Sequence, residues 1–236
     1  MSGRLGDTLM IRIIGGCDIA GDNITGMATS EDCVIIAEGL GPLCEPLHQC
    51  ADRAQERADD HSIQHGMYDE ENIGGRAHLA RYHLRHLLRS AQLPDGWRLN
   101  RARPNGEVIL CRSAMKLRML RPGPRLLADL APPPPGLNRA RISYYSNPDL
   151  NLFGAAGSNL IGVWAPDTET REIQIRIFRP IGLWRVGQYQ NTDIDFVLPR
   201  LGEDLFDMEF IPSDEGFEFP FEYPEEGEED ADSTDG

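Results

Sequence analysis

Residues 76–91, RAHLARYHLRHLLRSA, carry the clearest structural pattern in this chain of 236 residues. Small and apolar side chains recur in them at helical spacing and form one stripe, which consists of Ala77, Ala80, Leu84, Leu87, Leu88 and Ala91. Pro94 and the pair Asp95-Gly96 then end the pattern. The stretch predicts an amphipathic helix whose apolar side must be covered by other parts of the chain.

After this helix the period of the apolar residues changes from about 3.6 to about 2, which is typical of strands. Residues 97–102, 107–112 and 115–121 predict three short strands, the first two joined by the turn sequence Arg-Pro-Asn-Gly. Residues 159–165, 171–179 and 192–198 predict three more. In 171–179 the isoleucines alternate with polar side chains, so one face of this strand should be apolar and the other charged.

A shorter helix is predicted upstream, because Leu47, Cys50, Ala51, Ala54 and Ala58 recur at helical spacing after Pro46. Taken together, these elements predict an α+β fold, in which an antiparallel sheet of about five to six strands packs against one or two helices. A disordered acidic C-terminal tail is expected to follow it.

The chain divides by composition into five segments. Residues 1–44 are of uncertain fold, and residues 45–131 form a basic region of helix and β-meander. Residues 132–137 contain four consecutive prolines and predict a polyproline spacer. Residues 138–201 are rich in predicted strands and belong either to the same domain or to a second one. Residues 202–236 are acidic and low in complexity, which predicts disorder.

Composition excludes several classes of protein. With 40% hydrophobic and 26% charged residues, the chain is large and apolar enough to bury a core. No stretch has the length of apolar sequence that a transmembrane helix needs, and no signal peptide is evident. The 5 cysteines are irregularly spaced and odd in number, so reduced thiols and a cytoplasmic location are expected.

The net charge of −15 hides a strong asymmetry along the chain. Residues 1–72 hold 14 acidic and 4 basic side chains, whereas residues 73–147 hold 3 acidic and 14 basic ones. Residues 201–236 hold 15 acidic side chains and no basic one. Such asymmetry indicates either an interaction tail or a surface that binds polyanions.

The basic segment supplies the first candidate site. Clustered cations on a helix and on the strands after it favour binding to phosphate or to acidic partners. The alternative interpretation is a solvated outer surface, partly neutralised by the acidic first 72 residues. The candidate residues are Arg76, Arg81, Arg85, Arg89, Arg98, Arg101, Arg103, Lys116 and Arg118.

The tail supplies the second candidate. Phe217, Phe219, Phe221 and Tyr223 alternate with glutamate and proline, a pattern that keeps a docking segment soluble while its rings supply apolar contact. An edge strand on the protein's own sheet explains the alternation equally well. One hypothesis is that the tail folds back onto the basic segment and competes with external polyanions.

Evidence for catalysis is weak. The histidines lack the His-Glu-x-x-His spacing, the cysteines lack structural-zinc spacing, and no glycine-rich phosphate loop or nucleophile elbow occurs. No catalytic residue, metal ligand or cofactor is therefore predicted. Asp149 and Glu172 could in principle hold a metal against a phosphodiester, but the usual lysine is missing and Gln174 is a poor substitute.

We therefore expect a non-enzymatic binding or regulatory protein that uses a basic helix–sheet face and an aromatic–acidic tail. A protein partner is expected, with nucleic acid as a further candidate and no membrane association. The alternative is a metal-dependent phosphodiesterase or nuclease. The sequence resembles no family that could be tied to particular residues, and it leaves the oligomeric state open.

Overall fold

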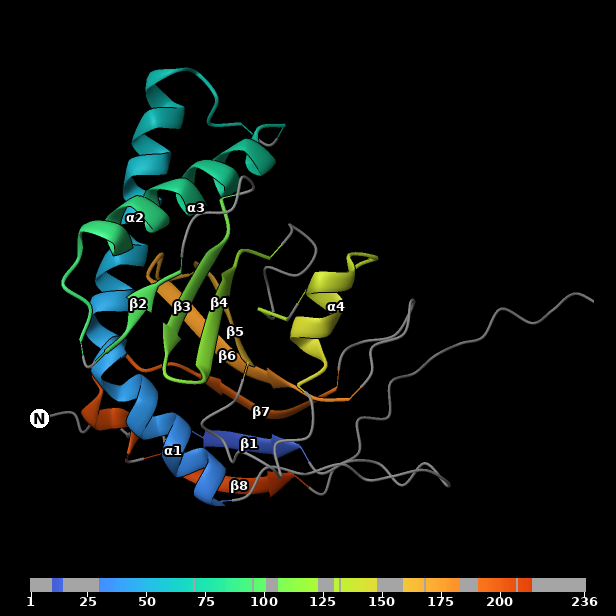
Figure 1. The fold of residues 1–236 in the computed structure, drawn as a ribbon. Helices are drawn as coiled ribbons and strands as arrows, with labels where there is room; N and C mark the ends of the chain where they lie inside the picture. The colour runs from blue at the N-terminus through green and yellow to red at the C-terminus, as the bar shows by residue number, and fades with distance from the viewer. Residues whose placement is uncertain are drawn as a thin grey trace, which may run out of the picture.

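The computed structural model of the chain describes residues 10–14, 30–69, 71–94, 96–100, 106–122, 130–131, 133–147, 159–167, 169–182, 191–206 and 208–213. These residues form one β-sheet with helices on both of its faces (Figure 1). The predicted α+β class is thus confirmed.

The sheet has 8 strands in the order β2-β3-β4-β5-β6-β7-β1-β8. Its strands are β1 (Met10–Ile14), β2 (Arg98–Leu99), β3 (Val108–Arg112), β4 (Met115–Leu120), β5 (Asn159–Pro166), β6 (Ile173–Pro180), β7 (Thr192–Val197) and β8 (Glu209–Ser213). Each of the six segments predicted as strands overlaps one of these strands. The order places β2 at one end of the sheet and β8 at the other.

The sheet is mixed, so the prediction of a purely antiparallel sheet was wrong. β4 and β5 are parallel, with Leu117 opposite Leu160. Their connection includes helix α4 (Arg139–Tyr145), and parallel neighbours need a crossover of this kind because a tight turn cannot join them. β1 and β8, the first and the last of the described strands, also pair in parallel.

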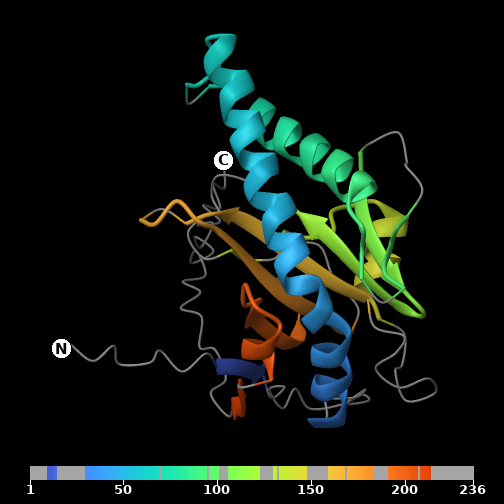
Figure 2. The same ribbon diagram turned by 90° about the vertical axis from the view of Figure 1, so that its left-hand side faces the viewer.

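Helices α1 (Ser30–Leu40), α2 (Cys44–Gln64) and α3 (Ile73–Ser90) cover one face of the sheet (Figure 2). The short 3-10 helix η1 (Gly41–Leu43) joins α1 to α2. The two predicted helices correspond to α2 and α3, and α1 lies in the segment whose fold was uncertain. The apolar stripe of α3 is buried through Ala80, Leu84 and Leu88, as its spacing requires.

The alternation in β6 separates two apolar clusters. Ile173, Ile175 and Ile177 belong to the main core between the sheet and α1–α3. Phe178 belongs to a smaller cluster on the opposite face, together with Tyr145 of α4. Because both faces are covered, strands such as β5 are buried along almost their whole length.

The proline-rich segment lies in the connection between two neighbouring strands of the sheet. β4 precedes it and β5 follows it, yet the two strands pair in register. Pro135 is buried, and the hydroxyl of Tyr145 donates to the carbonyl of Pro133 at 2.8 Å. The strands described within residues 138–201 therefore belong to the same sheet as those of the basic region.

The first part of the acidic C-terminal segment is ordered, so the prediction of disorder from residue 202 was wrong there. The 3-10 helix η5 (Glu203–Leu205) and strand β8 lie within the segment expected to be disordered from residue 202. Pairing with β1 explains why β8 is ordered, because hydrogen bonds between the two strands satisfy the backbone N–H and C=O groups of β8. Residues 214–236 lie outside the described residues.

A buried ion pair joins β6 to β7. The side chains of Arg179 and Asp193 are both 0% exposed, and the guanidinium binds the carboxylate through Nε–Oδ1 at 2.8 Å and Nη2–Oδ2 at 2.5 Å. Asp32 of α1 lies 3.4 Å from the same Nη2. The bidentate, charge-assisted contact holds β6 to β7, and the single longer contact of Asp32 links α1 to this pair.

None of the described helices has the length and hydropathy that crossing a membrane requires.

Candidate binding site at the edge formed by α3 and β2

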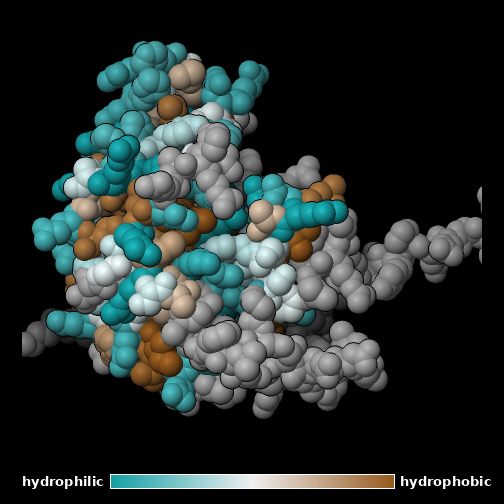
Figure 3. Space-filling model, in the orientation of Figure 1, coloured by the Kyte–Doolittle hydropathy of each residue, from teal (hydrophilic) through white to brown (hydrophobic). Residues whose placement is uncertain are grey.

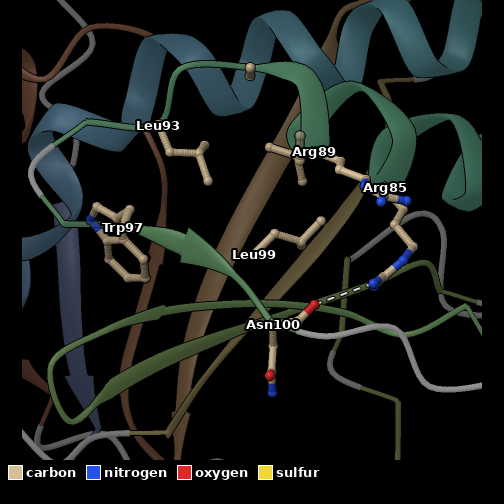
Figure 4. Close-up of a pocket in the computed structure, with 8 residues that line it drawn as sticks. Arg85, Arg89, Leu93, Trp97, Leu99 and Asn100 are labelled. Atoms are coloured by element: carbon tan, nitrogen blue, oxygen red, sulfur yellow. Dashed lines mark hydrogen bonds between the residues drawn. The ribbon is translucent and has the colours of Figure 1, made fainter.

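A pocket of about 450 Å³ lies between the C-terminal half of α3 and strand β2 (Figure 4). It combines two cationic side chains with apolar ones, and it lies at the end of the sheet where β2 is the last strand. Figure 3 shows hydrophobic surface in this region, with hydrophilic residues around it. The lining residues are Arg85, Leu88, Arg89, Ala91, Leu93, Trp97, Leu99 and Asn100.

The floor of the pocket is rigid. Leu88 is 1% exposed and Trp97 is 4% exposed, so both belong to the main core. The indole Nε1 of Trp97 donates to the carbonyl of Gly39 at 2.9 Å, which fixes the ring against α1. Leu93 and Leu99 are only partly buried and form apolar walls. The pocket is therefore preformed.

The two arginines differ in how they are held. Arg85 donates through Nη2 to the carbonyl of Asn100 at 3.2 Å and through Nη1 to the carbonyl of Glu107. These bonds tie α3 to β2 and to the start of β3, and they orient the guanidinium along the pocket. Arg89 is exposed in the last turn of α3. Arg89 is thus available to an incoming group, whereas Arg85 supplies a fixed positive charge.

Helix α3 has no acidic side chain to neutralise its cations. Arg81 donates to Nδ1 of His78 at 2.8 Å, and Arg76 lies 4.3 Å from the ring centre of Tyr68. Among the described residues, none of the four arginines of α3 forms an ion pair with a carboxylate. Their combined field therefore reaches solvent.

Cationic surroundings also affect the helix's own histidines. Burial lowers the pKa of His83, and the positive charges of Arg57, His61 and His86 lower it further.

The structure divides the remaining predicted cations between different environments. Arg98 and Lys116 are exposed, and both lie across from Cys111 on the face of the sheet opposite α3. Arg118 is buried, with its Nη2 2.8 Å from Oε1 of Glu107, and burial lowers its pKa. Arg101 and Arg103 lie outside the described residues. The predicted basic surface is therefore split by the sheet, and Arg118 is paired inside the fold.

The aromatic–acidic residues Phe217, Phe219, Phe221 and Tyr223 lie outside the described part of the chain. Their proposed role in binding stays a prediction.

The predicted metal-dependent alternative gains no support from its described residues. Glu172 is 67% exposed and lies 3.5 Å from Arg200, which binds Asp52 at 2.8 Å. Gln174 donates to Asp167 at 2.7 Å, and Asp149 lies outside the described residues. No group of three or more histidine, cysteine, aspartate or glutamate side chains in the described residues could hold a metal ion.

Comparison of the chain with models of protein families, with curated proteins and with solved structures finds no match.

The apolar half of the pocket was not predicted as a site. Trp97 and Leu99 were predicted as strand residues and Leu88 as core, and Leu93 lies in a turn sequence. One signal was present, because a tryptophan directly after Pro94-Asp95-Gly96 begins a short strand next to the most basic helix. Only the folded structure shows that this strand lies beside Arg85 and Arg89.

Proposed function

We propose that this chain is a non-enzymatic binding protein that takes up an acidic segment of a protein partner, one that also carries apolar side chains, at the pocket between α3 and β2. The observation that carries the proposal is the pocket itself. Arg85 and Arg89 stand beside an apolar floor of Leu88 and Trp97, and no carboxylate among the described residues neutralises the two arginines.

Charge supplies attraction and orientation. The arginine at the pocket entrance attracts an acidic segment over a distance of about 8 to 10 Å at physiological salt. Arg85 is already held by two backbone carbonyls, so little conformational entropy is lost when an anion approaches it. Electrostatics of this kind raises the association rate and selects acidic partners.

Apolar contact supplies the affinity. Binding energy at protein interfaces concentrates in a few apolar or aromatic side chains that fill preformed pockets. The walls formed by Leu93 and Leu99 are only partly buried, and a ring placed between them would remove more of their surface from water. A purely anionic ligand would leave this surface unused.

Nucleic acid is the less favoured partner. Its case depends on the cations of α3 together with those of the sheet, but Arg98 and Lys116 lie on the other face and Arg118 is buried in an ion pair. A phosphate backbone contacting α3 would reach only part of this set. The apolar floor of the pocket also has no counterpart in backbone recognition.

The test compares three labelled probes by fluorescence anisotropy at low and at physiological salt. The probes are a peptide of alternating Glu and Phe, a poly-glutamate peptide of equal charge and a DNA duplex. We expect the Glu–Phe peptide to bind most tightly. Arg89→Glu should weaken its binding by about tenfold or more, equal to about 1.4 kcal/mol.

The matched control is Arg53→Glu, which reverses an exposed charge on α2 outside the pocket lining and should leave binding nearly unchanged. Two outcomes would overturn the proposal. One is equal affinity for the Glu–Phe and poly-glutamate peptides, because it removes the apolar contribution. The other is tighter binding of the duplex than of either peptide, because it makes nucleic acid the partner.

A further inference from the structure

Strand β2 is the last strand at its end of the sheet, so no described strand pairs with its outer edge. Unpaired edges bind extended peptides by adding a strand, with the backbone supplying affinity and the side chains supplying specificity. The pocket lies directly beside this edge, because Leu99 and Asn100 line it. The two features form one surface.

The two faces of β2 differ in the chemistry they offer. Leu99 lies opposite Leu110, a core residue on the helix-covered face, and it lines the pocket. Arg98 lies opposite Cys111 on the other face, and Cys111 in turn lies opposite Lys116. Side chains of a strand alternate between faces. A strand that fits this edge therefore presents apolar side chains to the pocket and acidic ones to Arg98, its neighbour on the other face.

One segment of this chain has that alternation. Residues 217–223, FEFPFEY, place an aromatic ring at every odd position and Glu218, Pro220 or Glu222 at every even one. Proline has no N–H to donate and is accepted only where its nitrogen faces away from the neighbouring strand. Pro220 is at an even position like the two glutamates, so it does not interrupt the odd positions. The backbone N–H and C=O groups of the aromatic residues can therefore form the hydrogen bonds to β2.

A copy of the chain cannot easily present this segment to its own β2. The described chain reaches Ser213 at the end of β8, the strand at the opposite end of the sheet (Figure 1). Seven steps between neighbouring strands span about 34 Å. Phe217 lies four residues beyond Ser213 and reaches about 14 Å, and Phe221 reaches about 29 Å when fully extended. Helices α1 and α2 also cover the intervening face.

We propose that residues 217–223 of a second copy add as a strand to the outer edge of β2, with their aromatic rings in the pocket. The proposal rests on the function proposed above and names the partner of the same site. Each copy then has one acceptor edge at β2 and one donor segment that follows β8 in the sequence. Such a head-to-tail contact joins two different surfaces of the chain, so repeated contacts build rings or open chains of copies. The average size of these assemblies increases with protein concentration.

The experiment measures the mass of the full-length protein by sedimentation equilibrium from low to high micromolar concentration. The wild type should gain mass with concentration. The donor variant, Phe217→Ser with Phe219→Ser and Phe221→Ser, should stay at monomer mass, as should the acceptor variant, Arg89→Glu with Leu93→Asp. The control Leu137→Ser removes an apolar side chain that is 82% exposed outside the pocket and should associate like the wild type.

Mixing the two variants tests the direction of the contact. The donor variant keeps an intact β2 edge and the acceptor variant keeps an intact tail, so their equimolar mixture should form a dimer with one contact and no larger species. A wild type that stays monomeric over the whole range would overturn the inference. Association of the donor variant as strong as that of the wild type would do the same.

A labelled peptide of residues 214–224 separates this inference from the proposed function. Peptide binding to the donor variant, together with a monomeric wild type, overturns self-association and leaves the binding function standing. Absence of peptide binding overturns the β2 docking. In that case the Glu–Phe, poly-glutamate and duplex comparison decides the proposed function independently.

Discussion

Replacing Asp193 by asparagine should destabilise the protein strongly, because it leaves the guanidinium of Arg179 buried without its bidentate partner. Both side chains are 0% exposed. One nitrogen of this arginine, Nη1, is already buried without a hydrogen-bond partner in the structure. Loss of the carboxylate would remove the main compensation for the charge.

The expected magnitude follows from the geometry. Breaking a buried ion pair by removing one partner costs about 3 to 5 kcal/mol. The lower end applies here, because Asp32 remains 3.4 Å from Nη2 of Arg179. For a chain of this size, about 3 kcal/mol of unfolding free energy corresponds to a fall in Tm of about 6 to 12 °C.

The assay is equilibrium unfolding in urea followed by circular dichroism, with thermal melts in parallel. The matched control is Asp52→Asn, which breaks the pair with Arg200 in which the two side chains are 39% and 41% exposed. An exposed pair contributes less than about 1 kcal/mol. A second variant, Arg179→Met with Asp193→Leu, removes both charges and should recover much of the lost stability.

Similar small losses of unfolding free energy in Asp193→Asn and Asp52→Asn would contradict the predicted cost of an unpaired buried charge. A double variant less stable than Asp193→Asn alone would also contradict it, because the cost would then lie in packing and not in the uncompensated charge.

Three further predictions concern the rest of the fold. Gly202→Ala should lower the unfolding free energy by about 1 to 3 kcal/mol, because the added Cβ would lie 2.4 Å from the carbonyl oxygen of Gly41. The control Gly74→Ala adds a Cβ with no atom within 4 Å, so it should be neutral or stabilising in the same urea titrations. Burial lowers the pKa of His48, so its contribution to stability should be complete above pH 6.5 and be lost as pH falls from there through the folded-state pKa. His48→Gln should reduce this loss of unfolding free energy at low pH. An unchanged pH dependence in urea titrations at several pH values would contradict the prediction. Burial raises the pKa of Cys33 to about 11, so alkylation of the native protein at pH 8 should modify the partly exposed Cys111 well before Cys33. Peptide mass mapping measures the two rates. Equal rates would contradict the prediction and would show that α1 opens readily.

Periodic segments were predicted well because their pattern is local. The helix predicted over 76–91 is α3, Ile73–Ser90, since a stripe at helical spacing has few alternative interpretations. Helix α1 was missed although Cys33, Ile36, Ala37 and Leu40 lie at helical spacing and are buried. Its neighbouring glycines and its short apolar runs hid the pattern.

Pairing between distant segments could not be predicted. Nothing in the alternation of residues 115–121 shows that β4 pairs in parallel with a strand that begins at Asn159. The same limit applies to the site. The cations of α3 were predicted from their spacing, but the apolar wall opposite them comes from β2, and its position depends on the sheet. Arg118 and Lys116 share a face of β4, and only the packing of Glu107 and Tyr144 buries Arg118.

The position of β1 between β7 and β8 has a consequence for biosynthesis. This strand ends at Ile14, but its two neighbours begin only at Thr192 and Glu209. A nascent chain therefore holds an N-terminal strand with two unpaired edges until nearly all of the sheet has left the ribosome. Contacts that close so long a loop form slowly, and unpaired edges favour aggregation meanwhile. Translation speed and chaperone supply should therefore influence the yield of this protein.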